Sequence, residues 1–238
     1  MNSVTDEPIG PPVDATPAKR PGPVTLDGRF CKIEKLDVAR HGQSLWRAMK
    51  ADDRLWTYMG YGPFRDETSF LDWIEERTVL LDPTSYAVID KASDRARGIV
   101  TLMEIRPAMR VIEIGNIVYA PALQRTSAAT EAQYLMARHV FEDLGYRRYE
   151  WKCNALNEPS KRAAVRLGFT AEGTFRNHMI VKGRNRDTAW FAMTDGDWPA
   201  VKAMFERWLA PGNFDAAGRQ KVGLSELMSK RGEVEWTG

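Results

Sequence analysis

The chain has 238 residues, 43% of them hydrophobic and 28% charged, with a formal net charge of +2 at pH 7. This composition is typical of a globular domain of ordinary size, and the balanced charge argues against a protein devoted to nucleic acid. No apolar run approaches the roughly 18 residues that span a membrane, and the N-terminus lacks the apolar segment of a secretion signal. We therefore expect a cytoplasmic protein with neither a membrane nor a nucleic-acid partner.

The first predicted segment is a proline-rich tail. Residues 1–25 hold six of the 13 prolines and show no regular apolar spacing, which is typical of a disordered segment. The folded part begins with an alternating pattern at 29–36, which predicts a strand. Two helical patterns follow, one at 37–50 with Asp37 as a candidate N-cap, and one at 65–82.

The rest of the chain interleaves strands with helices. A hairpin is expected from 97–106 and 110–119, and the segment 169–195 is typical of two strands joined by a turn. The other elements are expected as a strand at 85–90, a helix at 127–145, a strand at 147–155 and helices at 158–168 and 197–210. This order favours an α/β (α+β) fold in which helices flank a mixed, mostly antiparallel central sheet. We assign the domain to 26–200, and a C-terminal helix and polar tail to 201–238.

The turn before the helix at 127–145 has the features of a phosphate site. A helix N-terminus leaves about four backbone N–H groups without partners and carries a partial positive charge, so it attracts phosphate. The residues from Thr126 to Thr130 are all small, which leaves this backbone accessible. The simpler interpretation is a helix that is merely capped by Thr126 or Ser127.

Two segments resemble the GNAT superfamily of acetyl-CoA-dependent N-acetyltransferases. The family's first pattern is Gln or Arg, two residues, Gly, one residue, then Gly or Ala; residues 124–129 match it with Ser127 in place of the first glycine. The matching positions of the second segment are Asn157, Ser160, Gly168, Phe169, Glu172 and Gly173. The resemblance covers roughly 26–200 and is greatest to the branch of ribosomal-protein alanine and serine N-acetyltransferases.

This resemblance implies acetyl-CoA as the cosubstrate and no metal. The pyrophosphate would lie on the turn that consists of Gln124, Arg125, Thr126, Ser127, Ala128, Ala129 and Thr130. Asn157 would hydrogen-bond the pantetheine arm, and the strand before the turn would splay from its neighbour to admit that arm. Serine fits at position 127 without strain if its φ is negative, whereas a positive φ would favour glycine.

Acetyl transfer to an amine needs a group that accepts the amine's proton and one that protonates the departing thiolate. Glu113 is a lone carboxylate in an apolar strand, and the resemblance implies that it is the base; the alternative is a structural ion pair with an arginine. Because side chains alternate along a strand, Glu113 is expected to share one face with Val111, Gly115, Ile117 and Tyr119. Ser160 takes the position of the acid in the ribosomal-protein branch, or it caps its helix.

The chain departs from the family at two further positions. The tyrosine acid of many members is replaced by Ala164, which leaves Ser160 as the candidate acid. A glutamate of the ribosomal-protein branch is replaced by Met179, so the base assignment rests on Glu113.

Basic residues gather in 161–186, and two of this region's residues are candidates for binding the acceptor. Arg176 and His178 are expected to point outward on one strand face; a solvated basic surface is the alternative. His178 has no Cys or His partner at metal-ligand spacing, so we expect no metal. The acceptor would be a small-molecule or peptide amine, and the chain would be a monomer or a homodimer.

Three classes of function compete on this evidence. The leading hypothesis is an N-acetyltransferase that works by direct attack in a ternary complex, because no Cys or Ser stands beside a His as a covalent nucleophile would. A non-catalytic acyl-CoA-binding sensor or scaffold is the alternative, favoured by Ser127, Ala164 and Met179. The third is a basic-faced protein that binds RNA or ribosomes, which would show strongly salt-dependent binding.

Overall fold

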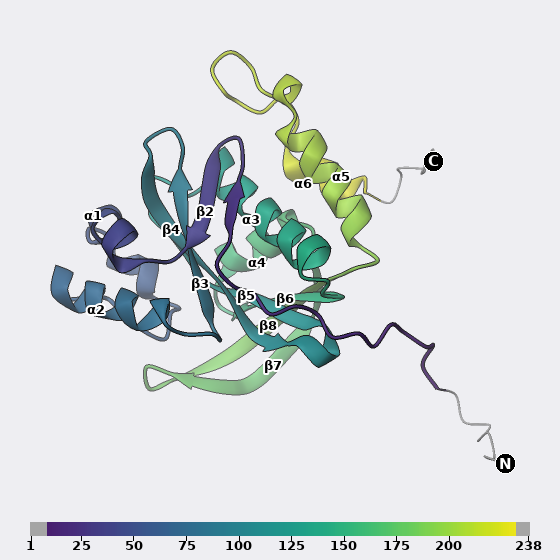
Figure 1. Ribbon diagram of the computed structural model, residues 1–238, viewed down its shortest axis with the longest axis horizontal. Coiled ribbons are helices and arrows are strands. Elements are labelled where there is room, and N and C mark those ends of the chain that lie inside the picture. Colours follow the sequence, from purple (N-terminus) through teal and green to yellow (C-terminus); the bar gives the residue numbers. More distant parts are fainter. Residues whose placement is uncertain (1–8, 232–238) are drawn as a thin grey trace.

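The computed structural model describes residues 9–231, which form one eight-stranded sheet with helices on both faces (Figure 1). The strand order is β1-β2-β3-β4-β5-β6-β8-β7, and only β5 and β6 pair in parallel. The predicted mixed, mostly antiparallel sheet is thus confirmed. The strands are β1 (Thr25–Asp27), β2 (Cys31–Lys35), β3 (Thr84–Asp90), β4 (Arg95–Arg106), β5 (Val111–Tyr119), β6 (Arg148–Asn154), β7 (Thr170–Val181) and β8 (Arg184–Thr194). The helices are α1 (Gln43–Met49), α2 (Glu67–Thr78), α3 (Ser127–Arg138), α4 (Glu158–Arg166), α5 (Trp198–Leu209) and α6 (Leu224–Ser229).

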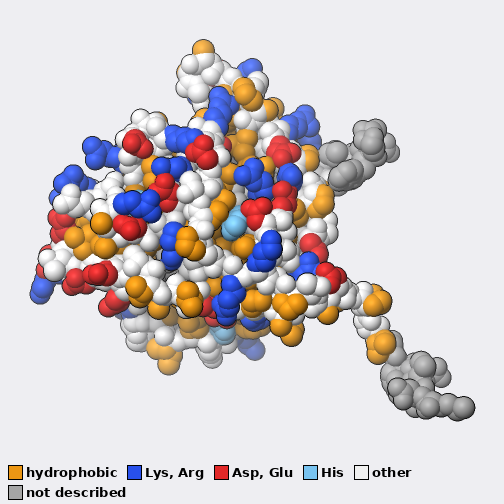
Figure 2. Space-filling view, in the orientation of Figure 1, with side chains coloured by type: hydrophobic (Ala, Val, Ile, Leu, Met, Phe, Trp, Pro, Cys, Tyr) orange, Lys and Arg blue, Asp and Glu red, His pale blue; other side chains and the backbone are white. Residues whose placement is uncertain are grey.

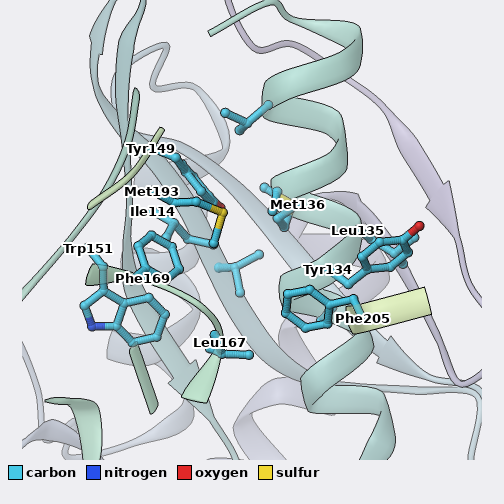
Figure 3. Close-up of a cluster of buried hydrophobic side chains, with 14 of the residues drawn as sticks. Ile114, Tyr134, Leu135, Met136, Tyr149, Trp151, Leu167, Phe169, Met193 and Phe205 are labelled. Atoms are coloured by element: carbon cyan, nitrogen blue, oxygen red, sulfur yellow. The ribbon is translucent and has the colours of Figure 1, made fainter. Parts of the chain in front are cut away.

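The sheet separates two hydrophobic cores, because alternate residues of each strand point to opposite faces. One core lies under α3, α4 and α5, and Figure 3 shows Ile114 and Trp151 from the strands facing Met136 of α3. The other core lies under α1 and α2, where Trp56, Phe70 and Trp73 pack against strands β3, β4 and β5. Helices on both faces therefore hold the middle of the sheet in place, and β5 and β6 lie there.

Helix α3 is anchored to the opposite edge of the sheet by one carboxylate. Glu131 is 4% exposed, and its oxygens accept hydrogen bonds from the backbone N–H groups of Arg29, Phe30 and Cys31 at 2.6 to 2.9 Å. These three donors lie in the turn between β1 and β2 and at the start of β2. A carboxylate that accepts several backbone N–H groups is strongly held, so this contact fixes where the N-terminal end of α3 lies.

Several element boundaries differ from the predicted ones. The helix predicted at 65–82 ends at Thr78, and Val79 is 75% exposed, because the approach to Pro83 disfavours helical backbone. Strand β1 and helix α6 were not predicted from the sequence. Helix α6 buries Leu224, Leu227 and Met228 at helical spacing, within a segment that is otherwise polar.

The N-terminal segment runs along the domain without helix or strand up to β1. The backbone N–H groups of Ala18 and Lys19 donate to the carbonyls of Pro107 and Leu144, and the Tyr86 hydroxyl donates to the carbonyl of Gly22. Part of the predicted tail, 18–24, is therefore attached to the body of the domain. The ends of both predicted tails, 1–8 and 232–238, lie outside the described residues.

Candidate active site

A gap opens between the two parallel strands in the middle of the sheet. Strands β5 and β6 pair only from Val111 with Arg148 to Ile114 with Trp151. Beyond this point β5 continues to Tyr119 without pairing with β6. The cause is a bulge, since Asn116 has φ +48° and the register between β4 and β5 shifts at the same place. Asparagine tolerates this left-handed conformation better than most residues, and bulges bend the strand that carries them.

The bulge also reverses the alternation of β5, which corrects one of our expectations. Ile112 and Ile114 belong to the core under α3, and past the bulge Ile117 and Tyr119 pack against that same core. Glu113 shares the opposite face with Gly115, as expected, but not with Ile117 and Tyr119. Strict period-two alternation fails here because the bulge adds one residue to the strand.

The turn beyond β5 presents free backbone donors at the N-terminus of α3. Thr126 is the N-cap, and its hydroxyl accepts a hydrogen bond from Ala129 N–H at 3.1 Å. The N–H groups of Arg125, Ser127 and Ala128 make no hydrogen bond to any residue within 9–231. The one positive φ in this turn, +62°, belongs to Arg125, so Ser127 sits at negative φ and is unstrained. These donors suit a phosphate.

The side chains of this turn are mostly committed to the protein itself. Gln124 donates to the Tyr119 carbonyl at 2.8 Å, and the Thr130 hydroxyl donates to the Thr126 carbonyl and accepts from Arg166. Ala128 and Ala129 are buried. The predicted pyrophosphate residues are therefore brought together as a backbone cradle, and most of their side chains shape it rather than point to a ligand.

Helix α4 begins on the other side of the gap. Its N-cap is Asn157, whose side chain accepts from Ser160 N–H at 3.2 Å, so Ser160 does not cap the helix. The Ser160 hydroxyl oxygen accepts a hydrogen bond from Trp151 Nε1 at 3.1 Å. Because the oxygen is the acceptor in this bond, the hydroxyl hydrogen is still available to donate.

Glu113 lies on the face of the sheet that points away from α3, beside the start of the gap. It is 6% exposed, and its Oε2 atom lies 2.9 Å from Lys152 Nζ. Burial raises the pKa of Glu113 to about 6 in spite of the opposing effect of Lys152. The partner of Glu113 is therefore a lysine and not the arginine that we considered. A side-chain carbon at Gly115 would come within 3.2 Å of Glu113 Oε1, so this second oxygen lies over Gly115, the first residue of β5 beyond its pairing with β6.

The long hairpin β7–β8 forms an open groove, and its Trp190 ring packs on Lys152, the partner of Glu113. Arg176 and His178 both line the groove together with Phe175, Asn177 and Asp187, and its volume is about 850 Å³. Phe175 and His178, three residues apart, both contact the Trp190 ring, because a bulge at Asn177 (φ +51°) interrupts alternation. The expectation that Arg176 and His178 simply alternate on one strand face was therefore wrong, although both border the same groove.

The segment between α1 and α2 reaches this same region. The Tyr58 hydroxyl donates to the Leu156 carbonyl at 3.1 Å, and Lys182 Nζ donates to the Trp56 carbonyl at 2.9 Å. Segment 53–61 is thereby joined to the tip of the β7–β8 hairpin and to the loop before α4.

The described residues give no support to two other kinds of site. No group of three or more His, Cys, Asp and Glu in the described part of the chain could hold a metal ion. No helix of that part is long and apolar enough to cross a membrane. Figure 2 shows Lys and Arg interspersed with Asp and Glu over the visible face, rather than gathered into a basic surface.

Sequence reasoning missed Lys152 and the spatial role of Gly115. Residues 148–154 alternate strictly, with Tyr149, Trp151 and Cys153 in the core and Arg148, Glu150 and Lys152 on the other face. A buried strand in the middle of a sheet with one fully charged face was the available signal, since buried charges need partners or a function. Gly115 carried no such signal, because its role depends on Met103 of the neighbouring strand.

Comparison with known proteins agrees with this geometry. The model of the Acetyltransferase (GNAT) domain matches residues 35–170. A GCN5-related N-acetyltransferase from Brucella melitensis is 46% identical, with a TM-score of 0.88 over 91% of this chain and 99% of that one. A protein described as a GNAT-family acetyltransferase from Chromobacterium violaceum is 40% identical, with a TM-score of 0.76 over 83% of this chain and 100% of the other.

A more distant structure shares the fold alone. A protein described as a ribosomal-protein-serine acetyltransferase from Vibrio cholerae is 17% identical, with a TM-score of 0.63 over 72% of this chain and 97% of that one. A search of the curated proteins finds no significant match to the chain. The family model spans more than half of the sequence, and two solved structures exceed 30% identity over most of it. The chain therefore belongs to the GNAT acetyltransferase family and is an acyltransferase.

Proposed function

We propose that this protein transfers an acetyl group from acetyl-CoA to a primary amine, either a protein N-terminus or a small-molecule amine, by direct attack in a ternary complex. The observation that carries the proposal is the gap between β5 and β6. It has free backbone donors of the turn before α3 on one side and the buried carboxylate of Glu113 on the other. A pantetheine arm that runs along β5 from this turn would therefore bring the thioester toward Glu113.

Backbone groups would hold the phosphates of the cosubstrate. The N–H groups of Arg125, Ser127 and Ala128 converge at a helix N-terminus, where negative charge is stabilised. Asn157 and the first turn of α4 border the gap on its far side and would contact the pantetheine arm. Since Ser127 has negative φ, it does not close this site through strain, which removes one feature that favoured a non-catalytic scaffold.

Glu113 would accept the proton that the amine loses. An amine is protonated at neutral pH and cannot attack until it gives up that proton. A carboxylate with a pKa of about 6 is mostly ionised at pH 7, and this pKa is close enough to pH 7 for the group to take up and release protons readily. Its Oε1 atom, on the side of Gly115, would take the proton directly or through one water.

Ser160 would protonate the leaving sulfur. As the new C–N bond forms, the C–S bond breaks and a thiolate departs, which needs a proton. The Ser160 hydroxyl belongs to the first turn of α4 and is oriented by the hydrogen bond from Trp151 Nε1. Burial raises the pKa of the Cys153 thiol. Because a neutral thiol is a poor nucleophile, a covalent acetyl-cysteine step is disfavoured here.

The acceptor would enter through the groove of the β7–β8 hairpin. Arg176 and His178 line that groove and Phe175 supplies an apolar wall. The resemblance to the ribosomal-protein branch makes a peptide N-terminus one candidate acceptor. Met179 differs from that branch, however, so small amines belong in the same screen.

The test is an amine screen that follows release of the free CoA thiol from acetyl-CoA. We expect thiol release that depends on both an amine and the enzyme, and a loss of roughly 10²- to 10⁴-fold in kcat/KM for Glu113→Gln, which is the usual contribution of a general base. Glu226→Gln, which changes an exposed carboxylate of α6, is the matched control and should retain full activity. Tight acetyl-CoA binding without transfer to any amine would contradict the proposal and favour the scaffold alternative.

A further inference from the structure

Glu113 belongs to a neutral group of six ionised side chains. Glu150 of β6 is 4% exposed and lies 2.9 Å from Arg106, 2.7 Å from Arg148 and 3.1 Å from Lys152. Arg148 also pairs with Glu172 of β7, and Lys152 pairs with Glu113. Three carboxylates are thus matched by three cations, and no charge in this group is left unbalanced.

The two buried carboxylates of this group are not equivalent. Burial alone would raise the pKa of Glu150, but Arg148, Lys152 and Arg106 outweigh it and lower that pKa. Burial raises the pKa of Glu113 to about 6, and the ammonium of Lys152 is the one cation within 4 Å of it among residues 9–231. Glu113 therefore depends on a single partner, whereas Glu150 has three.

Lys152 is itself held in one place. Its side chain is 12% exposed, and its Nζ atom lies between two carboxylates and 4.1 Å from the centroid of the Trp190 ring. A cation over a tryptophan face in a partly desolvated place is attracted by the ring. The long lysine chain is thus fixed at its end by contacts with β5, β6 and β8.

We infer that Lys152 is a positioning residue for the proposed base: it holds Oε2 of Glu113 and so leaves Oε1 over Gly115, the first residue of β5 beyond its pairing with β6. This inference rests on the proposed function, because it gives Lys152 a task only if Glu113 accepts a proton. The two oxygens of Glu113 then have separate tasks. Oε2 is bound to Lys152 at 2.9 Å, and Oε1 has no hydrogen-bond partner among the described residues.

The same ammonium keeps Glu113 ionised at the pH at which it must act. An opposite charge at hydrogen-bond distance lowers a carboxyl pKa by about 1 to 3 units. Without Lys152, burial and the nearby carboxylates would act on Glu113 unopposed. The charged groups that act on Glu113 are Lys152, Glu104 and Glu150. The next groups outward are Arg106 and Arg148, which pair with Glu150, then Glu172, which pairs with Arg148, and His178, which lies against Trp190.

The experiment measures the titration of Glu113 without relying on turnover. The ¹³C carboxyl signal of Glu113, assigned by its loss in Glu113→Gln, is followed against pH in the wild type, Lys152→Met and Lys152→Arg. We expect a midpoint near 6 in the wild type, a midpoint at least about one pH unit higher in Lys152→Met, and a midpoint near the wild type in Lys152→Arg. The acid limb of kcat/KM should move with it, so that Lys152→Met is about fivefold less active at pH 6.

Two controls separate this effect from a general loss of structure. Lys32→Met removes a lysine that pairs with Glu34 at 2.7 Å in β2 of the same sheet, and it should leave the Glu113 midpoint unchanged. Thermal melting checks that each variant folds, and Lys152→Gln replaces Lys152→Met if the latter does not fold.

The possible results also separate this inference from the proposed function. An unchanged Glu113 midpoint in folded Lys152→Met overturns the inference. A raised midpoint together with a shifted acid limb of kcat/KM supports the inference. Full activity of Glu113→Gln would instead overturn Glu113 as the base and with it the task of Lys152, whatever the midpoint does.

Discussion

Replacing Glu113 by glutamine should stabilise the folded protein at neutral pH. The carboxyl has a pKa of about 6 in the folded chain against the ordinary 4.5, so its ionised form is disfavoured by folding. That difference corresponds to roughly 2 kcal/mol when the group is fully ionised. The neutral amide of glutamine would resemble the protonated acid and avoid this cost. For a chain of this size, roughly 2 kcal/mol raises the Tm by about 4 to 8 °C.

The pH dependence of this gain has a definite sign. Glu113 binds its proton more tightly when the chain is folded, so folding takes up a proton between about pH 4.5 and 6. The wild type therefore gains stability from this group as the pH falls through that window. The advantage of Glu113→Gln should be complete above about pH 7 and vanish near pH 4.5.

Denaturant unfolding of both proteins at pH 7.5 and pH 5 measures the effect. A functional carboxylate held at an energetic cost gives a more stable but inactive variant, as is common for active-site residues. A variant that is less stable than the wild type at pH 7.5 would refute the reasoning. It would mean that the pair of Glu113 with Lys152 stabilises the fold, and that its role is structural.

Three further predictions concern how the site is built. Gly115→Ala would bring a methyl group 2.5 Å from Met103 Sδ and 3.2 Å from Glu113 Oε1. We expect a lower kcat in steady-state kinetics and a loss of only about 1 to 3 kcal/mol in the free energy of unfolding. An unchanged kcat would contradict this prediction. Gly28→Ala would place its methyl group 2.5 Å from the Glu131 carboxylate. The Tm should fall, because disturbing the hydrogen bonds between Glu131 and the backbone costs about 1 to 3 kcal/mol. An unchanged Tm would count against this anchor of α3. Ser127→Gly should leave the Kd for acetyl-CoA within about twofold of the wild-type value, because Ser127 has no positive φ that glycine would relieve. The substitution should cost roughly 0.5 kcal/mol of stability, since glycine is a poorer helix former. A much tighter Kd would show that the serine obstructs phosphate binding.

The sequence predicted most strands and helices because their periodicities are strong and their ends carry ordinary signals. Asp37 and the proline of helix α4 are examples, and both lie where capping rules put them. Helix α6 escaped prediction because only three apolar residues define it and they matter only against α4 and α5. Its segment is otherwise polar, so periodicity alone could not reveal it.

The sequence predicted the residue types of the candidate site but not how they lie relative to one another. Small residues at 126–130 and the lone carboxylate of Glu113 could be read from the sequence. The reversal of alternation after Asn116 and the one near Asn177 could not, since a bulge is set by pairing with a distant strand. Lys152 acquires its meaning from β5 and β8, and both lie far from it in the chain.

Calorimetric titration with acetyl-CoA tests the central claim most directly, with Ser127→Trp as the blocking variant and Ala92→Trp as a control in the exposed turn between β3 and β4. We predict micromolar binding by the wild type and by Ala92→Trp, and none by folded Ser127→Trp, because the indole would cover the donors at the start of α3. Equal binding by all three proteins, or no binding by the wild type, would contradict the assignment of the cosubstrate site to this gap.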